Sequence, residues 1–187
     1  KGSSSAKGRS PRTEGGRSTV VAHWLVKQEP TSYSWSEFAK EGETEWDGVH
    51  NPLALRHLRA MAPGDLALFY HSGDERACVG ILRIVRGPRP DPNDTRGSWS
   101  VTVRPVRPLR RPVTLAEIRN DPGFAGIDLL RISRLSVMPV SGNHWTRVLA
   151  HEDASPTPAR EAATGGRNGR GKATASRPRA RPVKRKR

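Results

Sequence analysis

The aromatic residues of this 187-residue chain are confined to its middle part. All five Trp, two Tyr and three Phe lie between Trp24 and Trp145, and neither end of the chain contains one. A segment that lacks aromatic and aliphatic area to bury cannot offset the conformational entropy that it would lose on folding. We therefore expect one folded domain over residues 23–150, between a disordered basic leader over residues 1–22 and a disordered Arg/Lys/Pro-rich tail over residues 151–187.

The net positive charge has the opposite distribution. Of the formal +15, the leader carries +4 (5 basic and 1 acidic residues), the tail +8 (11 and 3) and the middle +3 (17 and 14). Clustered Lys and Arg attract nucleic-acid phosphates whatever the base sequence, so we expect nucleic acid as the partner. The tail residues expected to bind phosphates are Arg177, Arg179, Arg181, Lys184, Arg185, Lys186 and Arg187. A localisation signal or a solubilising tail has the same composition.

Cys78 is the one cysteine, so the chain can form no intrachain disulfide and no zinc site of several thiolates. The sequence contains no apolar stretch of about 18 residues and no common motif of nucleotide-binding loops, serine hydrolases or zinc proteases. His71, Ser72 and Asp74 are sequence neighbours, whereas the members of a catalytic triad come from separate elements. We expect no enzyme activity, no cofactor, no metal and no membrane contact. We expect a monomer in a reducing intracellular compartment, either the nucleoid or cytoplasm of a bacterium or the nucleus of a eukaryote.

The first predicted strand is the segment Trp24–Pro30, WLVKQEP, in which apolar and polar residues alternate with period two. Pro30 has no N–H to donate to a sheet, so the strand ends or bends there. A lysine, an amide and a carboxylate therefore stand beside a forced turn: Lys27, Gln28 and Glu29. This composition suits the floor of a polar pocket, and it equally suits an ordinary strand end in solvent.

Cap and turn signals divide the rest of the domain into short elements. Helix starts are predicted at Ser34, Asn51, Thr114 and Ser141, and Pro63 is expected to end the second helix. Further strands are expected over residues 66–71, 77–86, 98–107 (half exposed) and 134–140, and loops over residues 44–48, with Trp46 exposed, and 88–97. This order indicates an α+β fold. About five or six strands would form a small mixed β-barrel with short helices around it, and the first and last strands would pair.

Three groups of aromatic and polar residues fall at strand ends or in loops: Trp24 with Lys27, Gln28 and Glu29; Trp46 with His50 and Asn51; and Tyr70 with His71 and Ser72. Aromatic faces stack on nucleobases, at about 1–3 kcal/mol per base, and amide, carboxylate and imidazole groups can read a base edge. The alternative is structural: Trp24 and Tyr70 belong to the core, Trp46 covers a barrel end, and the polar groups satisfy backbone.

Five segments, in this order, resemble the EVE domain family: WLVKQEP, EWDGVHN from Glu45, FYHS from Phe69, VGI from Val79, and RLSVMPV from Arg134 followed by Trp145. The resemblance covers residues 23–149. It implies a PUA-like barrel related to the YTH readers of methylated adenine, and a non-catalytic reader that holds a modified base, flipped from DNA, in a pocket. The implied pocket residues are Trp24, Lys27, Gln28, Glu29, Trp46, Val49, His50, Asn51, Tyr70, His71, Ser72, Ser136 and Met138.

Five positions depart from the family pattern. Gln28 stands where the family commonly has Ser, His50 where it has Arg, Pro52-Leu53 where it has Tyr-Gln, and Met138 where it has Gln. These positions lie at or near the implied pocket, so the resemblance predicts a pocket rather than a particular modification. We expect the pocket to supply selectivity and the tail to supply salt-dependent attraction. The alternatives are a structural protein that compacts nucleic acid through its basic tails, and a reader of RNA modifications.

Overall fold

The computed structural model describes residues 21–154, and every structural statement below concerns these residues. They form a six-stranded mixed sheet with the order β2-β5-β4-β3-β1-β6. The strands are β1 (His23–Gln28), β2 (Thr44–Trp46), β3 (Leu66–His71), β4 (Ala77–Pro90), β5 (Trp99–Thr114) and β6 (Val137–Val140). Strand β1 pairs with β3 in parallel and with β6 antiparallel, so the first and last strands do pair as predicted. The predicted disorder at the two ends of the chain lies outside the described residues.

Short helices surround the sheet: α1 (Trp35–Glu41), α2 (Pro52–Leu58), α3 (Leu115–Asn120), α4 (Asp128–Arg131) and α5 (Gly142–Asp153), with the 3-10 helix η1 (Pro122–Phe124). The four predicted caps are confirmed, because the side chains of Ser34, Asn51, Thr114 and Ser141 each accept a backbone N–H of the first turn. Helix α5 continues to Asp153, beyond the predicted domain end at residue 150. Within residues 21–154, no helix is both long and apolar enough to cross a membrane.

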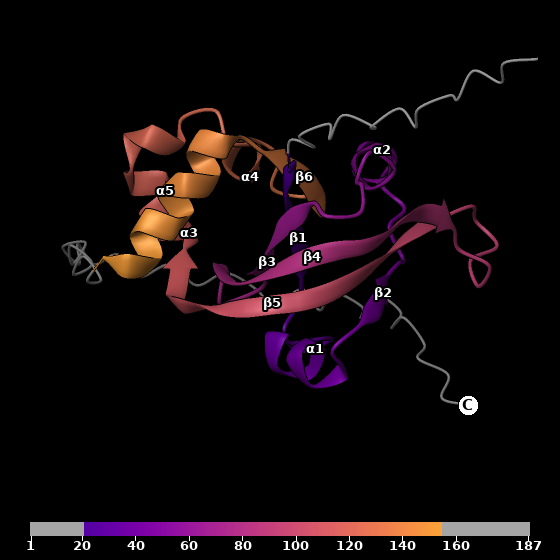
Figure 1. The fold of residues 1–187 in the computed structure, drawn as a ribbon. Helices are drawn as coiled ribbons and strands as arrows, with labels where there is room; N and C mark the ends of the chain where they lie inside the picture. The colour runs from indigo at the N-terminus through magenta and orange to yellow at the C-terminus, as the bar shows by residue number, and fades with distance from the viewer. Residues whose placement is uncertain (1–20, 155–187) are drawn as a thin grey trace, which may run out of the picture.

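Figure 1 shows β4 and β5 as a long two-stranded ribbon that crosses the molecule, with α3 and α5 gathered at one end. Helix α1 lies on one side of this ribbon and α2 on the other. The core lies against β1 and β3, where Leu25, Leu68 and Phe69 are fully buried. Both faces of these central strands are therefore covered, and polar side chains reach solvent mainly where the strands end.

The predicted loop over residues 44–48 is partly wrong, because Thr44–Trp46 forms strand β2 and pairs with Val101–Val103 of β5. The acidic side chain that suggested a loop has partners in the sheet. Glu45 accepts a hydrogen bond from Thr102 at 2.7 Å and forms an ion pair with Arg89 at 2.6 Å. The expectation that Trp46 is exposed is also wrong: its side chain is 6% exposed and meets the Phe69 ring edge-on, with centroids 5.6 Å apart.

Four predicted boundaries need correction. The irregular loop predicted from residue 88 begins later, because β4 continues to Pro90. The strand predicted over residues 98–107 extends to Thr114, and it is not half exposed over Ser100–Val103, where all four residues are buried. Helix α2 ends at Leu58, well before Pro63, and β6 starts only at Val137.

The edge of β5 beyond β2 is poor in free hydrogen-bond donors. Strand β2 covers only Val101–Val103, and the following sequence, VRPVRPLRRP, contains three prolines within the strand. Proline has no N–H, so it is tolerated where a strand lacks a hydrogen-bonded neighbour. The N–H of Arg110 donates instead to the Glu152 carboxylate of α5 at 2.8 Å. Glu152 is 5% exposed and also accepts two hydrogen bonds from Arg107, which lower its pKa.

Candidate functional site

The parallel pair of strands brings two predicted polar groups to one edge of the sheet. Lys27 and Gln28 of β1 lie opposite Tyr70 and His71 of β3, and the N–H of Ser72 donates to the Gln28 carbonyl at 2.8 Å. The carboxyl ends of parallel strands meet at the same edge, so residues far apart in the sequence become neighbours there. Gln28 and Ser72 are half-buried, so their polar groups reach the surface.

At this edge, Gln28 and His71 lie on one face of the sheet, next to a group of aromatic rings. The Phe69 ring contacts both the Trp46 ring, at 5.6 Å, and the His71 ring, at 5.5 Å between centroids. We call Gln28, Trp46, Phe69, His71 and Ser72 the strand-end cluster. It draws on all three groups singled out in the sequence: Gln28 from the first, Trp46 from the second, and His71 and Ser72 from the third.

Hydrogen bonds fix His71 in one tautomer. Its Nε2 accepts the backbone N–H of Trp35 at 3.0 Å, and its Nδ1 lies 2.6 Å from Oε2 of Glu75. A backbone N–H can only donate, so Nε2 carries no proton and Nδ1 donates to the carboxylate. His71 is 7% exposed and thus serves to hold α1 against the end of β3.

Lys27 and Tyr70 lie on the opposite face of the sheet from Gln28. The Lys27 Nζ donates to the Ser133 carbonyl at 2.5 Å and lies 5.7 Å from the centroid of the Tyr70 ring, while the Lys27 N–H donates to the Ser136 carbonyl at 2.8 Å. Burial lowers the pKa of Lys27 and raises that of Tyr70 to about 12. Met138 is fully buried opposite Leu25. Lys27, Tyr70 and Met138 are therefore separated from the strand-end cluster by the sheet itself.

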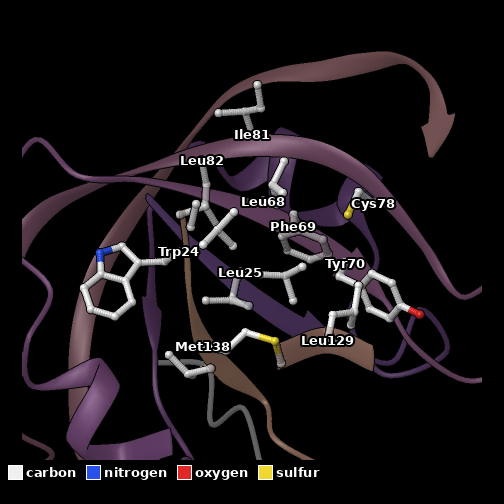
Figure 2. Close-up of a cluster of buried hydrophobic side chains, with 14 of the residues drawn as sticks. Trp24, Leu25, Leu68, Phe69, Tyr70, Cys78, Ile81, Leu82, Leu129 and Met138 are labelled. Atoms are coloured by element: carbon white, nitrogen blue, oxygen red, sulfur yellow. The ribbon is translucent and has the colours of Figure 1, made fainter. Parts of the chain in front are cut away.

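Trp24 lies in the core at the other end of β1. Figure 2 shows Trp24 and Tyr70 on opposite sides of the buried cluster, with Leu25 and Phe69 between them. The Trp24 Nε1–H donates to Asp65 at 2.9 Å, and the same buried carboxylate accepts the N–H groups of Ala22 and Ala62. The structural interpretation of Trp24 thus fits its position.

Val49 and His50 line a different hollow, next to α2. Its volume is about 190 Å³, and its other lining residues are Leu55, Arg96, Gly97 and Ser98. The His50 ring lies 3.3 Å from the Asp94 carboxylate and also contacts the Arg96 guanidinium. The Asn51 side chain is engaged as the α2 cap, where its Oδ1 accepts two N–H groups. Glu29 is exposed at the turn that follows β1. The predicted tail residues lie outside the described part of the chain.

The sequence interpretation missed Trp35, which supports the strand-end cluster. Its ring packs edge-on against Phe69 and Phe38 and lies over Gly80 of β4, where a Cβ would fall 2.4 Å from the Trp35 ring. A glycine inside a strand marks a close approach of another group. Gly80 in the middle of VGI was thus the available signal, although it did not identify which group approaches.

The buried Cys78 thiol is not activated as a nucleophile. Burial raises the pKa of the Cys78 thiol to about 12, so the thiol stays protonated. Between residues 21 and 154, no group of three or more His, Cys, Asp and Glu side chains is arranged to hold a metal ion. The chemistry that the arrangement offers is hydrogen bonding and stacking.

Comparisons with known proteins agree with this geometry. The EVE domain family model matches residues 22–151. Thymocyte nuclear protein 1 of Homo sapiens is 30% identical over 173 residues, with 74% of this chain and 77% of that protein covered. The Gallus gallus protein of the same name is 32% identical over 172 residues, with 73% and 71% covered.

Two solved structures illustrate the likeness in three dimensions. Rpa0253 from Rhodopseudomonas palustris is 40% identical with a TM-score of 0.68, with 71% of this chain and 94% of that chain covered. Human THYN1, solved in complex with DNA containing 5-methylcytosine, is 29% identical with a TM-score of 0.67, with 73% and 100% covered. The predicted PUA-like α+β fold is thereby confirmed. The chain belongs to the EVE domain family.

Proposed function

We propose that this domain is a reader of modified DNA that holds a flipped base at the strand-end cluster and does no chemistry on it. The observation that carries the proposal is the edge of the parallel pair, where the half-buried Gln28 and Ser72 adjoin His71, whose ring contacts Phe69 and, through Phe69, the Trp46 ring. The 5-methylcytosine DNA in the human THYN1 structure supports DNA as the partner. A reader of DNA works in the nucleoid or cytoplasm of a bacterium, or in the nucleus of a eukaryote.

The chemistry of the cluster suits one heterocycle. The Gln28 amide can donate and accept at a base edge, and the Ser72 hydroxyl can do either. A good bidentate contact gives about 1–3 kcal/mol of discrimination, and stacking on an aromatic ring contributes about 1–3 kcal/mol. Flipping a base costs a few kcal/mol. The two gains therefore offset the cost with little surplus, and phosphate contacts must supply most of the affinity.

Access to the Trp46 ring requires a local movement. Trp46 is 6% exposed, and we propose that a base reaches its ring when the adjoining segment Asp47-Gly48 moves aside. This segment is exposed and belongs to no helix or strand, and Gly48 has a φ of +69°. Exposed segments outside helices and strands open more easily than the core, as a segment that opens for a ligand must.

The proposal is tested with Gln28→Ala and Ser72→Ala, using short duplexes that each carry one modified cytosine or adenine, 5-methylcytosine among them, and the matching plain duplex. We expect the wild type to prefer at least one modified duplex. Each variant should lose about fivefold or more of that preference and keep its affinity for the plain duplex. Asn143→Ala, at an exposed position of α5, is the matched control. A wild type without any preference, or variants with an undiminished one, would show that the cluster does not read bases.

A further inference from the structure

Two arginines face each other directly across the β4–β5 ribbon. Arg83 of β4 and Arg104 of β5 are register partners in the antiparallel ladder, and both are exposed. Side chains at directly opposite positions of an antiparallel pair point to the same face, and like charges placed there are destabilising. The repulsion between the two guanidiniums costs the fold stability, and an anion bound between them would relieve it.

Arg83 forms no ion pair with a carboxylate of residues 21–154. Strands β4 and β5 contain seven arginines, and six of them form ion pairs in the described residues: Arg86, Arg89, Arg104, Arg107, Arg110 and Arg111. Glu43 forms ion pairs with both Arg86, at 2.6 Å, and Arg104, at 2.8 Å. Arg86 and Arg104 thus share one carboxylate, and Arg83, the register partner of Arg104, adds a positive charge that no carboxylate pairs with in the described residues.

The surface around this excess charge is hollowed and partly apolar. A depression of about 240 Å³ is lined by the two arginines together with Val85, Pro105 and Val106. Val106 is 47% exposed, and among residues 21–154 only Val21 is a comparably exposed large apolar side chain. A cationic floor beside an apolar rim matches a sugar-phosphate backbone, because guanidiniums bind phosphate oxygens and the sugar offers apolar surface.

We propose that this surface, the Arg83–Arg104 patch, binds a phosphodiester of the DNA backbone, with the adjoining deoxyribose against Val106. The assignment rests on the proposed function and adds the backbone contact to it. Backbone contacts position a protein on the duplex and carry no information on the base. The patch therefore holds the duplex while the strand-end cluster selects the modified base.

The test compares Arg83→Gln with Arg110→Gln in the full chain. Both changes remove one positive charge from an exposed arginine of the same ribbon, but Arg110 is paired with Asp153 at 2.6 Å. The measurement is the affinity for a duplex with one 5-methylcytosine and for its plain counterpart over a range of salt concentrations. We expect Arg83→Gln to weaken both by about tenfold at low salt and to flatten the log–log salt slope by roughly 0.9. The ratio of the two affinities should not change.

Arg110→Gln should weaken binding clearly less. Equal effects of the two changes would mean that only overall charge matters, and the patch would be refuted. Weaker binding of an acidic peptide such as polyglutamate, with DNA binding unaffected, would make the patch a protein-docking surface and also overturn the proposal. A wild type that binds both duplexes equally would refute base reading alone, because the Arg83 comparison still holds on plain DNA. A wild type that binds neither duplex would refute both.

Thermal unfolding checks the fold, and Arg83→Gln should not lower Tm because it removes a like-charge pair.

Discussion

Replacing Gly80 with alanine tests how tightly α1 is held against the strand-end cluster. A Cβ at this position would lie 2.4 Å from Cζ3 of Trp35 and 2.5 Å from two further ring atoms. The indole would have to move by roughly 1 Å to regain van der Waals separation. Its freedom is limited, because the ring also contacts Phe38 and Phe69 at 5.6 and 5.5 Å between centroids. Overpacking of this kind costs typically about 1–3 kcal/mol, and we expect a loss of about 2 kcal/mol.

Gly87→Ala is the matched control on the same strand. A Cβ there would meet Pro63 at 3.6 Å, which is an ordinary contact. The control should be neutral or slightly stabilising, by at most about 1 kcal/mol, because alanine restricts the unfolded chain. The measurement is the free energy of unfolding from urea denaturation, together with the affinity for modified and plain duplexes. Since the Trp35 N–H donates to His71, we also expect Gly80→Ala to reduce the preference for the modified base.

A double-mutant cycle identifies the cause. In a Trp35→Leu background the smaller side chain leaves room for the Cβ, so Gly80→Ala should become nearly as mild as Gly87→Ala. If Gly80→Ala is as mild as Gly87→Ala in the wild-type background, Trp35 does not constrain this strand and our account of the site's support is wrong. If its effect persists without the indole, the clash lies elsewhere.

Two further predictions concern acid stability and the tail. Asp121 accepts hydrogen bonds from Arg147 at 2.6 Å and His151 at 2.8 Å, which hold the pKa of its carboxyl well below the ordinary value. The ionised carboxylate therefore stabilises the folded state above about pH 4, and this stabilisation is lost as the pH falls further. The Asp121→Asn variant should therefore be less stable than the wild type at neutral pH, and the difference in their free energies of unfolding should become smaller in acid. Denaturation curves in which this difference does not depend on pH would contradict the prediction. Ending the chain after Ala154 removes 11 Lys and Arg residues and should flatten the salt dependence of DNA binding without changing base preference; a preference that disappears with the tail would refute the division between them.

Local signals in the sequence were sufficient for most elements. The caps at Ser34, Asn51, Thr114 and Ser141 depend on a side chain and the next three residues, so short-range chemistry determines where those helices begin. Strand β2 could not be predicted in this way. The Oε1 atom of its acidic residue Glu45 is held by Thr102 and Arg89, and those partners lie far away along the chain.

The candidate site was predictable in its residue types and only partly in its grouping. Strand alternation already places Lys27 and Gln28 on opposite faces, but a single strand does not reveal which face adjoins which partner. Asn51 illustrates a second difficulty, because its side chain serves as a helix cap and its oxygen is therefore occupied. Whether the predicted pocket residues contact a base stays a prediction for the binding assays described above.

The donor-poor edge of β5 has a consequence for crowding on DNA. A sheet edge with free N–H and C=O groups can template pairing with a strand from another molecule. Here Pro105, Pro108 and Pro112 have no hydrogen to give, and Glu152 occupies the Arg110 N–H. Many copies gathered along one polymer would thus stand side by side without their sheets merging, so a high local concentration need not lead to aggregation through this edge.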